Sequence, residues 1–150
     1  ILKAGQVSNA IVSSVDFLPT FADLAGVDLP ASQVFDGISL LDILEGAEPD
    51  PKRAIFWHYP VYHHDEPASA VRKGKWKLIH NLVNDSCYLY DLENDIGETA
   101  DLSQAHKEVA DELYHLLEEW RSDCNAEFPV PNPGFIPEGR YEWGKHPDQN

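Results

Sequence analysis

The stretch that decides the fold is RAIFWHYPVYHHDEPASAVRKGKWKLIHNLVNDSCYLYDL, which spans residues 53–92. Apolar and polar residues alternate along it, and β-branched and aromatic residues are frequent, so the pattern predicts strands rather than helices. Turn residues divide it into four candidate strands, at 54–59, 69–73, 75–82 and 87–92. Gly74, between two lysines, supplies the positive φ that a tight hairpin requires. The stretch therefore predicts a four-stranded antiparallel sheet.

Two helices are predicted before this stretch. Asp16 caps the first, which ends at Gly26 and has Pro19 in its first turn. The second is short and runs from its cap at Ser39 to Gly46. The residues at 48–51, rich in proline and acidic side chains, form a linker by composition, so we expect one domain over residues 1–50 and another over residues 51–126.

The longest predicted helix follows the sheet, over residues 104–122, with Ser103 as its N-cap. Its apolar residues recur at helical spacing and form one stripe: Val109, Leu113, Leu116, Leu117 and Trp120. A helix with one apolar face and a sheet with one apolar face bury each other, which predicts an α+β fold. Prolines between positions 129 and 137 exclude regular helix, so residues 127–150 are expected to form an extended tail.

The net charge of −15 is unevenly distributed. Residues 1–52 carry −6 and residues 93–123 carry −8, whereas residues 53–92 carry +1 and include a group of cations: Arg72, Lys73, Lys75 and Lys77. An acidic surface of this kind repels nucleic acid, and no apolar run reaches the roughly 18 residues of a membrane span. Cations that alternate with apolar residues are typical of a solvated strand face; alternatively, they attract a small anionic ligand.

The 150-residue chain contains no methionine and opens on Ile1, so we expect it to be a piece of a longer protein. Its 43% hydrophobic content suffices for one core. Cys87 and Cys124 either pair or remain free thiols, and their spacing fits no metal-binding pattern. His80 lies at an alternating strand position and is predicted to be a hydrogen-bonded core histidine.

Five short blocks of the sequence carry a family resemblance. They are SVDFLPTFADLAG at 14–26, DGISL at 36–40, FWHYP at 56–60, AVRKGKWKLI at 70–79 and LYDL at 89–92. Their order and spacing resemble the C-terminal part of a sulfatase of the arylsulfatase type, in the alkaline phosphatase superfamily. The resemblance implies the last helices of a large α/β domain, which carries the chemistry, followed by a smaller domain in which a four-stranded antiparallel sheet packs against a long helix.

The resemblance also implies what the rest of the protein supplies. Sulfatases use a Cys or Ser of a C/S-x-P-x-R motif, converted to formylglycine, beside a bound Ca²⁺, and neither cysteine here lies in such a motif. We therefore expect no catalytic residue or metal ligand in this chain, and formylglycine and Ca²⁺ in the complete enzyme. The implied partners are the upstream sulfatase domain and a sulfate ester, either a small molecule or a sulfated sugar. The implied location is periplasmic, extracellular or lysosomal-like.

A candidate substrate rim is formed by the loop after the first strand together with nearby cations: His58, Tyr59, Tyr62, His63, His64, Arg72 and Lys75. Loops held by rigid sheets are where binding residues gather, and in related enzymes this domain lines one side of the cleft. Two other interpretations remain open. The loop aromatics pack against the large domain, or the loop holds Zn²⁺ through His58, His63, His64 and Asp65.

Two functions from different classes follow from these observations. The first is the C-terminal part of a sulfuric ester hydrolase, which completes the fold and lines the substrate cleft. The second is a non-catalytic binding or interaction module that shares the sulfatase tail. Apolar residues of the first two helices lose part of their partner surface in an isolated chain, so self-association is expected through Phe17, Phe21, Leu40 and Leu44.

Overall fold

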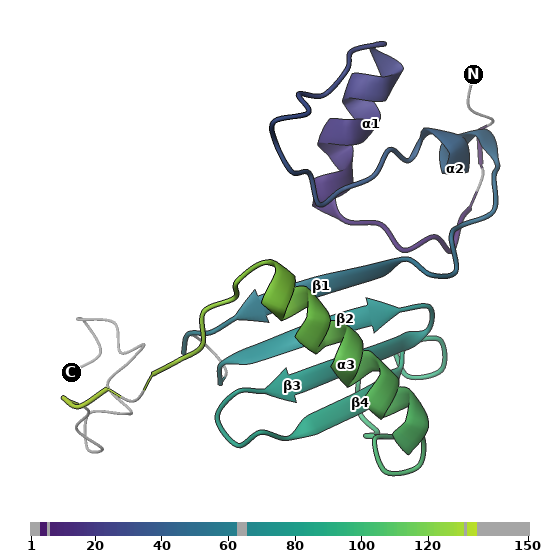
Figure 1. Ribbon diagram of the computed structural model, residues 1–150. Coiled ribbons are helices and arrows are strands. Elements are labelled where there is room, and N and C mark those ends of the chain that lie inside the picture. The colour runs from purple at the N-terminus through teal and green to yellow at the C-terminus, as the bar shows by residue number, and fades with distance from the viewer. Residues whose placement is uncertain (1–3, 6, 63–65, 131, 135–150) are drawn as a thin grey trace, which may run out of the picture.

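Figure 1 shows a computed structural model of the chain, which describes residues 4–5, 7–62, 66–130 and 132–134. Its elements, in chain order, are η1 (Ser14–Asp16), α1 (Phe17–Leu24), α2 (Leu41–Glu45), β1 (Ala54–Tyr59), β2 (Ala68–Lys73), β3 (Trp76–Asn81), β4 (Cys87–Asp91) and α3 (Lys107–Asp123). The strands form one antiparallel sheet in the order β1-β2-β3-β4, and α3 lies across one face of it (Figure 1). The expected α+β fold is confirmed.

The β2–β3 hairpin fixes the register of the sheet. Lys73 pairs with Trp76 across a two-residue turn, and Gly74 has φ 57°. A positive φ at the first turn position fits a type II′ turn, whose twist matches that of the strands. The same register sets Val71 opposite Leu78, and Leu78 opposite Leu89. Because side chains alternate between faces, these three residues point to one face of the sheet.

The core lies between this face and α3. Val71, Leu78 and Leu89 are fully buried there. They form one cluster with three buried residues of the helix, and the other stripe residues are partly buried around it: Ala110, Leu113 and Leu117, then Val109, Leu116 and Trp120. The rings of Phe56 and Trp120 stack at 5.0 Å, which joins β1 to the last turns of α3. The predicted apolar stripe is thus confirmed as the face that meets the sheet.

The start of α3 differs from the sequence-based expectation. The helix begins at Lys107, with His106 at the N-cap position, and not directly after Ser103. The Ser103 hydroxyl donates to Asp101 Oδ2 at 2.9 Å, and the Ser103 amide donates to Asp101 Oδ1 at the same distance. Because the preceding carboxylate engages both groups, the Ser103 side chain does not serve as the helix cap.

The N-terminal segment is joined to the sheet by a buried ion pair. The Arg53 guanidinium, just before β1, lies 2.6 Å from Asp16 Oδ1, and the Asp16 side chain is fully buried. The amides of Ser13 and Ile38 donate to the same carboxylate at 2.8 and 3.0 Å. Burial raises the pKa of Asp16, but these amides and Arg53 outweigh it, so the pKa is lowered.

Helix α2 also begins later than expected. Leu40 occupies its N-cap position, while Ser39 Oγ donates to Asp23 at 2.6 Å and accepts from the Leu41 amide at 3.2 Å. Gly46 ends the helix with φ 104°, as expected. Leu40 is buried, in contrast to the exposure expected for it in an isolated chain.

None of the helices in the described ranges has both the length and the apolar character of a membrane span.

Candidate functional site

The predicted rim residues lie at two places on the sheet. His58 and Tyr59 end β1 and Tyr62 follows in the loop, whereas Lys75 lies in the β2–β3 hairpin, beside the start of β1. The two places lie at opposite ends of β1, whose length is roughly 17 Å at about 3.4 Å per residue. His63 and His64 lie outside the described residues, as does Asp65 of the alternative Zn²⁺ site. The structure thus places His58, Tyr59 and Tyr62 at one end of β1, away from Lys75, but the side chains of His58 and Tyr59 point to opposite faces of the sheet.

His58 has both ring nitrogens engaged within the chain. Nδ1 lies 2.7 Å from Ser69 Oγ, and Nε2 lies 2.6 Å from the backbone oxygen of Glu127. A carbonyl oxygen only accepts hydrogen bonds, so Nε2 carries the hydrogen of this pair. The ring also meets Phe128 edge-on, at 5.6 Å between centroids. His58 therefore points to the α3 side of the sheet and binds the segment that follows α3.

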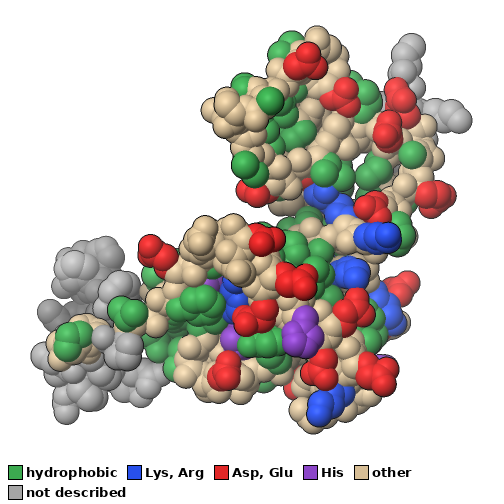
Figure 2. Space-filling model, in the orientation of Figure 1, with side chains coloured by type: hydrophobic (Ala, Val, Ile, Leu, Met, Phe, Trp, Pro, Cys, Tyr) green, Lys and Arg blue, Asp and Glu red, His purple; other side chains and the backbone are tan. Residues whose placement is uncertain are grey.

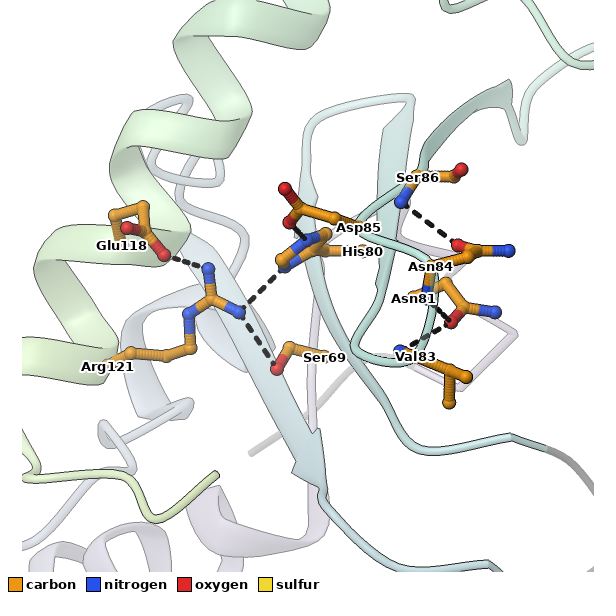
Figure 3. Close-up of polar contacts among 9 residues, drawn as sticks. All are labelled: Ser69, His80, Asn81, Val83, Asn84, Asp85, Ser86, Glu118 and Arg121. Carbon is orange, nitrogen blue, oxygen red and sulfur yellow. Dashed lines mark hydrogen bonds and ion pairs between the residues drawn. The ribbon is translucent and has the colours of Figure 1, made fainter. Parts of the chain in front are cut away.

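A buried polar network extends from this point beneath α3 (Figure 3). Arg121 Nη1 donates to Ser69 Oγ at 3.3 Å and lies 2.9 Å from His80 Nδ1. Ser69, His80 and Arg121 are only 1%, 5% and 3% exposed. At its two ends, His80 Nε2 lies 2.8 Å from Asp85 Oδ1, and Arg121 Nη2 donates to Glu118. The prediction of a hydrogen-bonded core histidine is confirmed for His80.

The network fixes the tautomer of His80. Arg121 has only donors, so the facing Nδ1 accepts and the hydrogen sits on Nε2, where Asp85 accepts it. Sequence reasoning missed the burial of Arg121. A signal was present, because Arg121 follows Leu113 and Leu117 at intervals of four and so continues the buried stripe by one turn.

Three of the four clustered cations form ion pairs with carboxylates. Lys73 pairs with Glu112 at 2.7 Å, Lys75 with Asp91 at 2.7 Å, and Lys77 with Glu98 at 2.5 Å. The hydrogen bond from Lys75 is the main reason that the pKa of Asp91 is lowered. Lys75 Nζ also lies 4.7 Å from the centre of the Trp76 ring. These cations are partly neutralised, which weakens the case for an anion-attracting cluster.

Arg72 lies on the sheet face opposite α3, where it pairs in register with Ile55 and Lys77. Its Nε is buried and has no hydrogen-bond partner within the described part of the chain. On the same face, Trp57 and Tyr59 are 47% and 53% exposed. This face therefore combines exposed aromatic surface with a buried guanidinium nitrogen. Exposed apolar surface of this kind is typical of a face that packs against another domain.

Two of the hollows in the described part of the chain are shallow, and neither combines catalytic groups. One, of about 300 Å³, is lined by Asp85, Cys87, Ala110, Asp111 and Tyr114. Burial, followed by the charge of Asp85, raises the pKa of the Cys87 thiol, which disfavours the reactive thiolate. The other, of about 340 Å³, lies between the β2–β3 hairpin and α3. Cys87 and Cys124 are both free thiols.

The residues that the structure describes do not fit the cofactors of a sulfatase. Within the described ranges, no three His, Cys, Asp or Glu side chains are grouped so as to hold a metal ion. No cysteine or serine of the sequence lies in a C/S-x-P-x-R motif. On the face that carries α3, acidic side chains are dispersed among apolar ones, and most of the Lys and Arg side chains in view lie along the side nearer the N-terminal segment (Figure 2). No step of sulfate ester hydrolysis is therefore assigned to these residues.

Comparisons with known proteins agree with this architecture. The chain is 34% identical over 131 residues to a sulfatase of Formosa agariphila, covering 77% of this chain and 24% of that protein. It is 35% identical over 127 residues to an N-acetylglucosamine-6-O-sulfatase of Bacteroides thetaiotaomicron, and the match covers 79% of this chain and 22% of that protein. A structure solved in complex with its substrate D-glucosamine-2-N,6-O-disulfate superposes with a TM-score of 0.68 at 33% identity, covering 85% of this chain and 27% of that one.

The fold and these matches define the C-terminal region of a sulfatase. The family model described as N-sulphoglucosamine sulphohydrolase, C-terminal, matches residues 1–123, and the chain belongs to that family. It spans about a quarter of the length of the curated relatives reported above, at 24% and 22%. The resemblance of the five sequence blocks to a sulfatase C-terminus is thus confirmed.

Proposed function

We propose that this chain completes a sulfuric ester hydrolase that acts on a sulfated sugar and that it lines one side of the substrate cleft. The observation that carries the proposal is the match to the structure solved with D-glucosamine-2-N,6-O-disulfate, at 33% identity and a TM-score of 0.68. Formylglycine and Ca²⁺ would belong to the upstream domain. In this chain, the loop that begins at the end of β1 would contact the non-sulfated part of the substrate, through Tyr59 and Tyr62.

The proposed partner of this chain is the upstream domain of the same enzyme. Two surfaces support this pairing. On the sheet face opposite α3, Trp57 is 47% exposed, and Arg72 Nε on the same face has no hydrogen-bond partner among the described residues. On α1, Phe17 and Phe21 stack on each other at 6.1 Å and remain 55% and 63% exposed. Apolar surface of this extent is typical of an interface.

The test compares the complete enzyme with the isolated chain. Residues 1–150 alone should release no nitrophenol from nitrophenyl sulfate above background, because binding contacts that do not favour the transition state leave the rate unchanged. In the complete enzyme, Tyr62→Ala should raise KM for a sulfated glucosamine about tenfold with kcat little changed, as expected for uniform binding. Tyr62→Phe keeps the ring and should stay near wild type, as should Glu119→Ala on the exposed side of α3. Turnover by the isolated chain, or no hydrolysis of any sulfate ester by the complete enzyme, would contradict the proposal.

A further inference from the structure

The segment after α3 is attached to the end of β1. The His58 imidazole binds the Glu127 carbonyl through Nε2 at 2.6 Å. Phe128 lies between two side chains, with its ring 5.6 Å from the His58 ring and 5.2 Å from the Arg121 guanidinium carbon. One hydrogen bond and two ring contacts thus hold residues 127–128 against the sheet, at the point where the chain leaves the helix.

This attachment rests on rigid groups. His58 Nδ1 lies 2.7 Å from Ser69 Oγ, and Ser69 in turn accepts from Arg121. Ser69 and Arg121 are almost completely buried, and Arg121 also meets His80. Because each of these groups is hydrogen-bonded to another, Ser69 fixes the orientation of the His58 ring, and the ring's Nε2–H points to the Glu127 carbonyl.

The attached segment lies beside the proposed rim. The loop after β1 starts at Pro60, two residues beyond His58, and Val61 and Tyr62 are 50% and 55% exposed. In the attached segment, Phe128 is 51% exposed and Val130 is 84% exposed. Two stretches far apart in sequence therefore present apolar side chains at the same end of the sheet.

We propose that His58 is a positioning residue, not a substrate contact, and that it fixes residues 127–130 as a second wall of the substrate rim, beside the loop after β1. In this arrangement Phe128 and Val130 contact the non-sulfated part of the substrate, and His58 acts only through them. The attachment stands on the geometry of this chain alone, whereas the rim role rests on the proposed function.

Two substitutions of His58 separate its two hydrogen bonds. Asn places its side-chain polar atoms near the Nδ1 position, within reach of Ser69, but nothing at the Nε2 position. Gln places an N–H near Nε2 and should retain the bond to Glu127. His115→Asn, at an exposed histidine of α3 outside the network, is the control for loss of an imidazole. Phe128→Ala removes the second contact at a half-exposed site, where folding is not at risk.

The experiment uses the complete enzyme and two readouts. The first is cleavage after Glu127 by a glutamyl endopeptidase under native conditions, measured by mass spectrometry, which should accelerate about tenfold in His58→Asn, the factor expected for one lost hydrogen bond. The second is kinetics on a sulfated glucosamine, in which His58→Asn and Phe128→Ala should each raise KM about five- to tenfold while kcat stays within about twofold. His58→Gln and His115→Asn should match wild type in both readouts.

The outcomes decide between roles. A raised KM in His58→Asn with unchanged cleavage would show that His58 contacts the substrate itself, and would overturn the inference. Accelerated cleavage with unchanged KM would show that the attached segment is not part of the rim, and would also overturn it, while the proposed function would stand. If the wild-type enzyme hydrolyses no sulfate ester, the proposed function fails and the rim role with it, and the cleavage readout still decides whether His58 holds the tail.

Discussion

Gly37→Ala is expected to separate two segments of the backbone. A Cβ at position 37 would lie 2.0 Å from the Val15 carbonyl oxygen, 2.4 Å from the Val15 carbonyl carbon and 2.8 Å from the Asp16 nitrogen. Cβ atoms do not approach other atoms within 3.0 Å, so the two segments have to move apart by about 1 Å in a closely packed region. Gly37 does not require a positive φ, so the clash alone determines the effect.

The cost has two parts. Overpacking of this kind costs about 1–3 kcal/mol. Moving residue 37 also stretches the bond from the Ile38 amide to Asp16 Oδ1, which is 3.0 Å long, and leaves a buried carboxylate with one donor fewer. That loss costs about 1–3 kcal/mol. The sum is about 2–6 kcal/mol of local stability, so amide exchange through local opening should accelerate by about 30-fold or more.

Hydrogen exchange of the complete protein measures this effect at two amides. The Ile38 amide donates to Asp16, and the Leu40 amide donates to Thr20 Oγ1 at 2.9 Å, so both should lose protection. Gly97→Ala is the matched control, because a Cβ there would meet the Thr99 methyl at 3.4 Å and Asp95 Oδ1 at 3.8 Å, both ordinary contacts. Equal exchange at Ile38 in wild type and Gly37→Ala would refute the argument from steric contact.

Three further predictions concern the core, pH and assembly. Leu113→Ala should cost about 2–5 kcal/mol of the local stability of the sheet, measured by hydrogen exchange of β3 amides, because Leu113 is 2% exposed, whereas the exposed Glu119→Ala should change it little. The pKa of Asp16 is lowered in the folded state, so the stability that its ionised carboxylate contributes is complete above the unfolded pKa of about 3.9 and is lost as the pH falls through the folded-state pKa. The Ile38 amide should therefore lose protection from hydrogen exchange at acid pH, and protection that does not change with pH there would contradict this. The isolated chain should self-associate through α1, and light scattering that reports a monomer, with α1 ordered, would contradict this.

The sheet was predictable because its signals are local. Alternation along each strand and the glycine between Lys73 and Lys75 located all four strands to within one or two residues. Period-two patterning records which residues face the core, and a two-residue turn fixes the register of its hairpin. The stripe of the long helix was equally legible, since helical spacing brings its apolar residues to one face.

The helix starts were less predictable, because a capping residue has competing local partners. Ser103 and Ser39 both match the pattern of an N-cap, yet their hydroxyls donate to Asp101 and Asp23. For Ser39 the partner lies 16 residues away, beyond any capping pattern. A sequence pattern identifies a group that is able to cap a helix, but the carboxylates brought near by folding decide whether it does.

The sequence by itself determined the fold class, the elements and the family, since these depend on periodicity and on the order of short blocks. Only the tertiary structure decided the roles of individual polar side chains. His58 has the composition of a binding residue, but its partner is a carbonyl 69 residues away. Lys73 belongs to a cationic run, but Glu112, 39 residues away, pairs with it. The physical reason is that a charge or a hydrogen-bonding group takes its function from whichever group lies within about 3 Å, and chain folding sets that neighbour.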